Sequence, residues 1–151
     1  MNFRKAKINV NKIKPEETEA ITIDCYEVDD DVREIVSYVK SRQGQLTGKS
    51  DGETYEISVK DVYYIESVDN RSFIYTASKT YETPGKLYEL EELLKPMRFQ
   101  RISKSSIVNL MKIKSIKPSL NGRLLAVLAN KEEIIISRKY VSDLKKTLKG
   151  E

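Results

Sequence analysis

The spacing of apolar residues changes along the chain, and each spacing predicts a different element. Residues 20–27 carry apolar side chains at every second position from Ile21 to Cys25, which is the two-residue repeat of a strand. Residues 7–10 alternate in the same way, and the region around Pro15 has the composition of a turn. We therefore expect two strands near the N-terminus.

A helical repeat follows these strands. Apolar side chains recur at three- and four-residue intervals from Val32 to Val39. Asp29 or Asp30 can cap the first turn, because an acidic side chain accepts hydrogen bonds from free N–H groups at the positive end of the helix dipole. The pattern ends near Gly44. One amphipathic helix is predicted, and with the two strands it makes a ββα-like extension.

Short alternating segments separated by Gly, Asn and Asp fill most of the remaining chain. Asp51-Gly52 suits a tight turn that needs positive φ, so a hairpin is expected over residues 45–59. Leucines at helical spacing predict a short helix over residues 86–94, which Pro96 ends, and a last helix begins at Ser137 or Arg138. Further strands are predicted over residues 62–68, 73–77, 79–83, 100–102, 113–117, 123–128 and 133–136.

These elements predict a mostly β fold of the α+β class, with small antiparallel sheets and short helices. We divide the chain into an N-terminal extension over residues 1–45 and a β-rich domain over residues 46–151. The extension is interpreted as a dimerisation or regulatory segment.

The composition argues against catalysis. The chain has no His and one Cys, so it lacks a Ser-His triad, a His general base and the common zinc ligand sets. Its 6 glycines form no phosphate-binding loop. We expect no enzyme activity, no metal or cofactor, and no small-molecule substrate. Cys25 has no partner for an internal disulfide and is predicted to be a small core residue.

The sequence shows no membrane or export segment. Its apolar runs fall far short of the roughly 20 residues that a helix needs to span a bilayer. The N-terminus has basic residues but no apolar stretch of a secretory signal. We expect a soluble, cytoplasmic protein.

Charge is distributed unevenly along the chain. Residues 98–151 carry 13 Lys and Arg against 4 acids, while residues 1–97 carry 14 basic and 19 acidic side chains. A polyanion such as DNA would be attracted to the C-terminal part, with an affinity that falls as salt rises. The alternative is a set of solvated Lys side chains on strands and on the last helix.

Two polar loops carry side chains that suit nucleic acid. The first is Asn70-Arg71-Ser72, because Asn and Arg can form paired hydrogen bonds with adenine and guanine edges. A plain Asn-containing β-turn is the alternative. The second loop combines a cation, hydroxyls and free backbone N–H groups, which suits phosphate, although its serines could instead cap a helix. The candidates in this loop are Arg101, Ser103, Lys104 and Ser105.

A third candidate lies where a strand passes into the last helix. Arg138 and Lys139 follow Ser137, which is a good N-cap residue. Two cations at the positive end of a helix are poorly placed against its dipole, which suggests an external anion. Arg123, in a turn after Asn121-Gly122, is a further candidate for a contact with the DNA backbone.

Four segments that follow one another in order carry a family resemblance, which covers roughly residues 46 to 149. The sequence resembles the LytTR-type DNA-binding domain of bacterial transcription regulators, a mostly β module that binds DNA through loops. The segments are Tyr63-Tyr64-Ile65-Glu66-Ser67, Leu87-Tyr88-Glu89-Leu90-Glu91-Glu92-Leu93, Phe99-Gln100-Arg101-Ile102-Ser103-Lys104-Ser105-Ser106-Ile107-Val108-Asn109 and Ser137-Arg138-Lys139-Tyr140-Val141.

The resemblance implies sequence-specific binding to duplex DNA and assigns roles to the loops. The first loop would enter a major groove with Arg71 or Ser72 at the position of the base contact. Lys104 would be the main contact of the second loop, with Ser103 and Ser105 beside it. Where relatives can have a His in the first loop, this chain has none, so its base preference would differ.

The same resemblance assigns the third loop and suggests partners. Lys139, with Arg138 beside it, would read a second groove segment, whereas Asn109 would tie backbone and not touch DNA. Operators of the family are short direct repeats read by two copies, so a homodimer is expected. Many relatives carry a receiver domain of about 120 residues, as response regulators do, and the extension is too short for one. Stand-alone relatives suggest a small inhibitory membrane protein as a partner.

Two other functions compete with this reading. The chain could be a non-enzymatic interaction module whose basic loops bind an acidic protein, or it could bind RNA. Charge reversal at Lys104 and Lys139 distinguishes the DNA-binding reading, since both side chains are expected to be exposed.

Overall fold

A computed structural model describes residues 1–150, and the chain divides into two units, Met1–Val39 and Lys40–Glu151. The boundary lies within α1, Asp30–Arg42. Asp29 caps this helix, because its side chain accepts a hydrogen bond of 3.0 Å from the N–H of Val32. Gly44, with φ of +80°, follows the helix, which confirms where the helical pattern ends.

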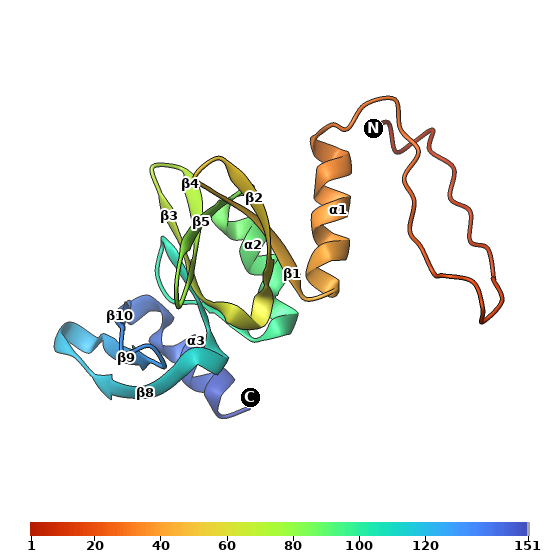
Figure 1. The fold of residues 1–151 in the computed structure, drawn as a ribbon. Helices are drawn as coiled ribbons and strands as arrows, with labels where there is room; N and C mark the ends of the chain where they lie inside the picture. The colour runs from red at the N-terminus through yellow and green to blue at the C-terminus, as the bar shows by residue number, and fades with distance from the viewer. Residues whose placement is uncertain (151) are drawn as a thin grey trace. The chain divides into compact units, whose positions relative to one another are not determined.

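The two strands expected ahead of α1 are absent, and this part of the prediction is wrong. Residues 7–10 and 20–27 run as an open loop without a strand ladder (Figure 1). The side chains of Ile8 and Val10 are 90% and 92% exposed, and Cys25 is also exposed rather than buried. A strand requires a hydrogen-bonded neighbour, and this unit provides none, so the alternating sequence alone does not form one.

The second unit contains a seven-stranded antiparallel sheet with the order β2-β1-β5-β4-β3-β7-β6 (Figure 1). Two-residue turns with positive φ close two of its hairpins: Asp51 and Gly52 join β1 to β2, and Asp69 and Asn70 join β3 to β4. The strands are β1 Gln45–Ser50, β2 Glu53–Ser58, β3 Val62–Val68, β4 Arg71–Thr76, β5 Thr80–Thr83, β6 Phe99–Arg101 and β7 Ser106–Asn109.

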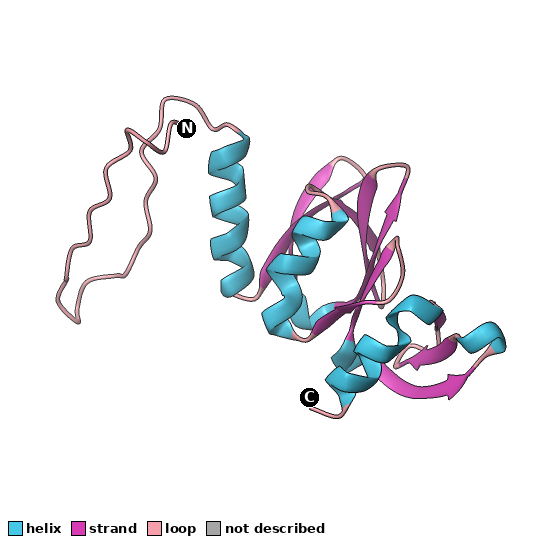
Figure 2. Ribbon diagram, turned by 180° about the vertical axis from the view of Figure 1, so that it is seen from behind, coloured by secondary structure: helices cyan, strands magenta, loops and turns pink. Residues whose placement is uncertain are grey.

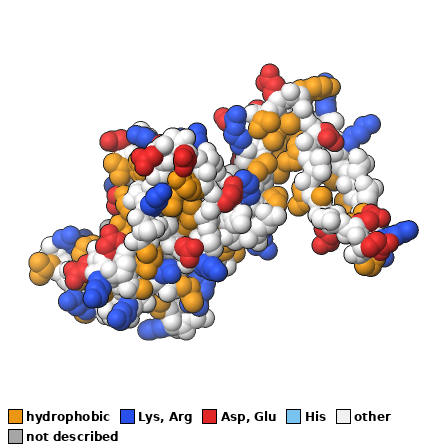
Figure 3. Space-filling model, in the orientation of Figure 1, with side chains coloured by type: hydrophobic (Ala, Val, Ile, Leu, Met, Phe, Trp, Pro, Cys, Tyr) orange, Lys and Arg blue, Asp and Glu red, His pale blue; other side chains and the backbone are white. Residues whose placement is uncertain are grey.

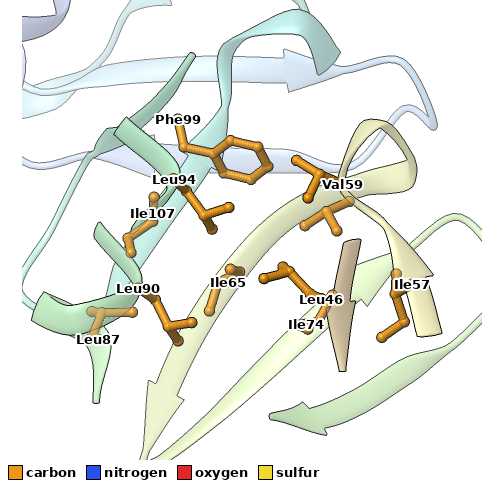
Figure 4. Close-up of a cluster of buried hydrophobic side chains, with 11 residues drawn as sticks. Leu46, Ile57, Val59, Ile65, Ile74, Leu87, Leu90, Leu94, Phe99 and Ile107 are labelled. Atoms are coloured by element: carbon orange, nitrogen blue, oxygen red, sulfur yellow. The ribbon is translucent and has the colours of Figure 1, made fainter. Parts of the chain in front are cut away.

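Helix α2, Leu87–Leu94, packs on one face of this sheet and closes the first hydrophobic core. Leu90 and Leu94 lie beside Ile65 and Ile107 in Figure 4, so the leucine stripe faces β3 and β7. Ile65, Leu94 and Ile107 are fully buried. The helix ends at Leu94, and a 3-10 turn that contains Pro96, Lys95–Met97, follows it, which confirms the predicted stop.

A second, three-stranded antiparallel sheet has the order β10-β9-β8 and packs with α3 (Figure 2). Tyr63 and Val108, from β3 and β7, contribute to this second core, because successive residues of a strand face opposite sides. Strands β3 and β7 therefore connect both cores. The elements are β8 Ile113–Pro118, β9 Leu124–Leu128, β10 Glu133–Ile136 and α3 Arg138–Leu148, with further 3-10 turns at Val59–Asp61, Leu110–Lys112 and Leu120–Gly122.

The mostly β fold with short helices and antiparallel sheets is thus confirmed for the second unit. The sequence pattern missed one strand, β7, because Ser106 to Asn109 shows no alternation and lies next to the Ser-rich bend. Asn109 behaves as expected: it is 2% exposed, its amide donates to the Val62 carbonyl at 2.8 Å, and its oxygen accepts from Met111. Among residues 1–150, no helix is long and apolar enough to cross a membrane.

Candidate nucleic-acid interface

Backbone hydrogen bonds hold the polar loops of the second unit next to one another. The N–H of Ser67, next to the β3–β4 turn, donates to the carbonyl of Ser105 in the β6–β7 loop at 2.8 Å. The N–H of Ser137, at the start of α3, donates to the carbonyl of Ile102 at 2.9 Å. The β6–β7 loop thus lies between the β3–β4 turn and the N-terminus of α3.

The β3–β4 turn presents Asn70 at its tip, and Asn70 is exposed with φ of +62°. Arg71 follows it and is exposed, but its guanidinium already has a partner. It donates from Nε to Glu82 Oε1 at 2.8 Å and from Nη2 to Oε2 at 2.5 Å. These hydrogen bonds hold the pKa of the Glu82 carboxyl below its usual range and raise the pKa of Arg71. This pair of hydrogen bonds ties the residue after the β3–β4 turn to strand β5.

Ser72 does not fit the role expected of it. It is 2% exposed, and its hydroxyl donates to the carbonyl of Gly85 at 2.8 Å. Its side chain faces inward because it follows the exposed Arg71 in an alternating strand. Of the two residues proposed for the base contact, only Arg71 is accessible.

Arg101 is a positioning residue in this structure and not a free cation. Its Nε and Nη2 donate to the carbonyls of Ser103 and Lys104 at 2.6 and 2.5 Å, and its Nη1 donates to Glu91 Oε1 at 2.8 Å. Its side chain is 17% exposed. Its donors hold two loop carbonyls and an acid of α2, so a contact with DNA would require Arg101 to give up at least one of these partners.

The β6–β7 loop is therefore folded by its own contacts. The N–H of Ser105 donates to Ser103 Oγ at 3.1 Å, and the N–H of Ile102 donates to the Ser106 carbonyl at 3.0 Å. Lys104 stands exposed at the tip, and within residues 1–150 its ammonium has no ion pair or hydrogen bond. This loop offers a cation and hydroxyls, as its composition predicts.

The start of α3 adjoins the β8–β9 turn. A Cβ on Gly122 would lie 2.9 Å from Cδ of Arg138, so the stem of Arg138 crosses this glycine. The contact places the Arg138 side chain beside the turn that leads into Arg123, and both residues are exposed. Lys139 is also exposed, with its ammonium 5.9 Å from the ring centre of Tyr140. Ser137 is the N-cap residue, although its side chain makes no cap hydrogen bond.

Lys and Arg side chains gather over the region of the second unit that carries β8, β9, β10 and α3 (Figure 3). The exposed cations of the candidate loops are Arg71, Lys104, Arg123, Arg138 and Lys139, of which Arg71 and Lys104 come from the β3–β4 turn and the β6–β7 loop outside that region. Such a concentration of positive charge attracts a polyanion. Among residues 1–150, no group of three or more His, Cys, Asp and Glu could hold a metal ion.

Two acidic residues, Glu82 and Glu91, were not identified from the sequence although they hold Arg71 and Arg101. Glu82 lies opposite Phe73 in the β4–β5 ladder, so it is a diagonal neighbour of Arg71 on one face. A correct strand register would have revealed this pair. Glu91 lies on the exposed side of α2, and no pattern in the sequence connects it with a loop ten residues later.

The chain is similar in sequence to known DNA-binding regulators. The sequence model of the LytTr DNA-binding domain matches residues 52–149. An uncharacterised HTH-type transcriptional regulator of Staphylococcus aureus strain NCTC 8325 is 32% identical over 139 residues, which is 90% of this chain and 94% of that protein. The sensory transduction protein LytT of Bacillus cereus is 30% identical over 93 residues, covering 62% of this chain and 38% of LytT.

A solved structure shares the fold. It is the LytTr DNA-binding domain of a Bacillus cereus protein described as a methyl-accepting/DNA response regulator. The TM-score is 0.66 at 28% identity, over 70% of this chain and 96% of the solved domain. The term HTH in the name of the staphylococcal relative does not describe residues 1–150 of this chain, because strands separate all three α-helices.

Proposed function

Because the chain belongs to the LytTR DNA-binding domain family, we propose that it is a transcription regulator that binds duplex DNA sequence-specifically through the loops of its second unit. The observation that carries this proposal is the pair of backbone hydrogen bonds that join Ser105 to Ser67 and Ile102 to Ser137. They hold three polar loops together before any ligand is bound. A helix is not the reading element.

The loops divide the work between bases and phosphates. Asn70, at the tip of the β3–β4 turn, is the residue we propose to read a base edge, since an amide can bond adenine in bidentate fashion. Arg71 would either read guanine, which requires it to leave Glu82, or hold the turn. Lys104, with Ser103 and Ser105, would contact phosphate or base edges in the adjoining groove.

Cations at the start of α3 complete the surface. Arg138 and Lys139 lie in the first helical turn, where free backbone N–H groups also favour anions. We propose that Lys139 approaches a second stretch of groove, and that Arg138 and Arg123 contact phosphates. Neither a catalytic step nor a cofactor enters this proposal, which places the protein with the DNA of the cytoplasm.

Two copies on a direct-repeat operator are part of the proposal, and so is a small membrane protein that restrains the regulator. Both come from the family and not from the geometry of the loops. If the purified protein and a candidate membrane protein fail to associate in detergent, the second partner is refuted.

The function is tested by selecting duplex DNA from a random pool and titrating the selected site with Lys104→Glu, Lys139→Glu and Lys60→Glu. Lys60 is an exposed lysine in the 3-10 turn ahead of β3, at the opposite end of that strand from Ser67. Each loop substitution should weaken binding about tenfold or more, whereas Lys60→Glu should have little effect. If no motif is recovered, or if all three variants bind equally, the proposal fails and an acidic protein partner becomes the better reading.

A further inference from the structure

The residues ahead of α1 expose apolar side chains that a stable monomer would cover. Within Met1–Val39, Val32 is the only buried hydrophobic residue. Ile8, Val10 and Ile21 are 90%, 92% and 73% exposed. Scattered exposed residues are ordinary, but a whole unit with a single buried side chain lacks a core. This unit therefore lacks a surface against which to pack.

The two segments of the open loop match each other in antiparallel register. If Ile8 faces Ile23, then Val10 faces Ile21, and Lys7 faces Asp24. The same register sets Lys12 against Glu19. Residues 4–14 carry five basic side chains and no acid, while residues 16–31 carry eight acids and no basic side chain. Opposite-charge and apolar pairs directly across strands both stabilise a sheet.

The chain does not make this pairing within itself, and its turn explains why. Glu17 donates its N–H to the Lys14 carbonyl at 2.9 Å, so Pro15 and Glu16 are the central residues of a two-residue turn. Proline requires negative φ, and Glu16 is not among the residues with positive φ. Two-residue hairpins need positive φ at the first central position, and other turns splay the strands. Within Met1–Val39, no backbone hydrogen bond joins residues 5–13 to residues 18–26.

We propose that residues 5–13 of one chain pair as an antiparallel strand with residues 18–26 of a second copy, so that the N-terminal unit is the interface of a homodimer. The exchange between a basic and an acidic segment occurs twice under twofold symmetry. It satisfies the backbone groups of both segments and brings Ile8, Val10, Ile21 and Ile23 of each copy onto paired faces. A second copy is the partner because the complementary segment belongs to this chain.

The pairing is tested with two full-length variants that carry opposite charge changes. Lys7→Glu with Lys12→Glu makes both segments acidic, and Glu19→Lys with Asp24→Lys makes both segments basic. Analytical ultracentrifugation at micromolar concentration should show a wild-type dimer, two monomeric variants, and a restored 1:1 dimer when the variants are mixed. Only pairing between chains predicts restoration by mixing.

Three results would overturn the proposal. The first is a monomeric wild type, which would assign the exposed apolar residues of 5–13 and 18–26 to contact with a different protein. The second is a dimer formed by each variant alone, and the third is a mixture that stays monomeric. If the mixture stays monomeric while a chain with all four substitutions regains a protected hairpin in amide exchange, the pairing is intramolecular. Circular dichroism confirms that the second unit remains folded in every variant.

The dimer proposal rests on the function proposed above only because it expects two copies on one operator. Dimer formation and DNA binding can therefore fail separately. Lys7→Glu with Lys12→Glu should bind a duplex with one half-site within about twofold of wild type and lose the tighter binding to two repeats. Lys104→Glu with Lys139→Glu should lose DNA binding but remain dimeric. A loop variant that loses its dimer would instead show that the interface lies in the second unit.

Discussion

At the scale of single residues, the structure separates side chains that build the loops from those free to contact DNA. Arg101 and Ser72 belong to the first kind, since each donates to backbone carbonyls. Asn70 and Lys104 belong to the second, since both are exposed at loop tips. The sequence predicted where these loops lie, because turn residues are local signals. It could not separate these roles, because burial depends on contacts with distant residues.

Ser72→Ala should lower stability without changing DNA recognition. The substitution leaves the Gly85 carbonyl without its hydroxyl donor, and losing a partly buried hydrogen bond costs about 0.5–1.5 kcal/mol. Urea unfolding followed by circular dichroism measures the loss. Affinity for the selected site should stay within about twofold of wild type under conditions where the variant is folded. A tenfold loss of affinity with unchanged stability would return Ser72 to the DNA contacts.

Arg101→Lys should loosen the β6–β7 loop although it keeps the charge. A lysine ammonium cannot reproduce the planar fork that holds Ser103, Lys104 and Glu91 together. We expect a loss of about 1–3 kcal/mol in unfolding free energy and a parallel loss of DNA affinity. Glu91→Gln should show a smaller change in the same direction. An Arg101→Lys variant with full affinity would mean that the fork does not set the loop.

DNA binding should be nearly independent of pH in the physiological range. The chain has no His, so none of its side chains ordinarily titrates between about pH 5 and 7. The hydrogen bonds of Arg71 lower the pKa of Glu82. The contribution of this pair to folding stability is therefore complete above the ordinary carboxyl pKa. It is lost only as the pH falls through the lowered value. Fluorescence anisotropy across this range tests the expectation, and a transition near neutrality would contradict it.

At the scale of elements, turn chemistry predicted hairpins well, and alternation predicted strands only where a neighbour exists. Asp51-Gly52 and Asp69-Asn70 adopt the positive φ values that close two-residue hairpins. The segment 20–27 has apolar residues at alternate positions from Ile21 to Cys25, yet it is not a strand. Strand formation requires a partner that a local pattern does not contain. Strand β7 shows the opposite case, because pairing with β3 and β6 makes it a strand without alternation.

Gly48→Ala should destabilise the large sheet. A Cβ at this position of β1 would lie 2.7 Å from Cδ1 of Ile57 and 2.7 Å from Cβ of Tyr81. Both neighbours belong to adjacent strands, so relief requires a shift of the backbone or of a buried side chain. Overpacking of this kind costs about 1–3 kcal/mol. Lys49→Ala, at the next and exposed position, is the control and should be nearly neutral in the same thermal or urea unfolding experiment.

At the scale of the whole molecule, the two units differ in charge. The acidic residues 16–31 belong to the N-terminal unit, and the exposed cations of the loops belong to the second unit. Fold and charge asymmetry together were predictable for the second unit, because its elements are marked by turns and helix stops. The absence of strands ahead of α1 could not be predicted in the same way, because a strand forms only beside a hydrogen-bonded neighbour, and Met1–Val39 contains none.

The salt dependence of operator binding should report the number of phosphates contacted. If Lys104 and Arg138 each neutralise one phosphate, replacing either with Ala should reduce the slope of log K against log salt by about 0.9. Removing a base contact such as Asn70 should instead lower affinity and leave the slope unchanged. Titrations between about 50 and 200 mM salt separate the two effects. Equal slopes for all three variants would contradict the assignment of Lys104 and Arg138 to phosphates.

The hydrogen bonds from Arg101 to the β6–β7 loop should affect the rate at which the protein associates with DNA. Because the carbonyls of Ser103 and Lys104 are already fixed by the guanidinium, the loop need not fold when it meets DNA. Encounter should then be limited by diffusion and electrostatic steering and not by a conformational step. Residence time, set by how well each base fits, would distinguish operator from bulk DNA. A regulator built in this way can sample many sites quickly and remain only at a few.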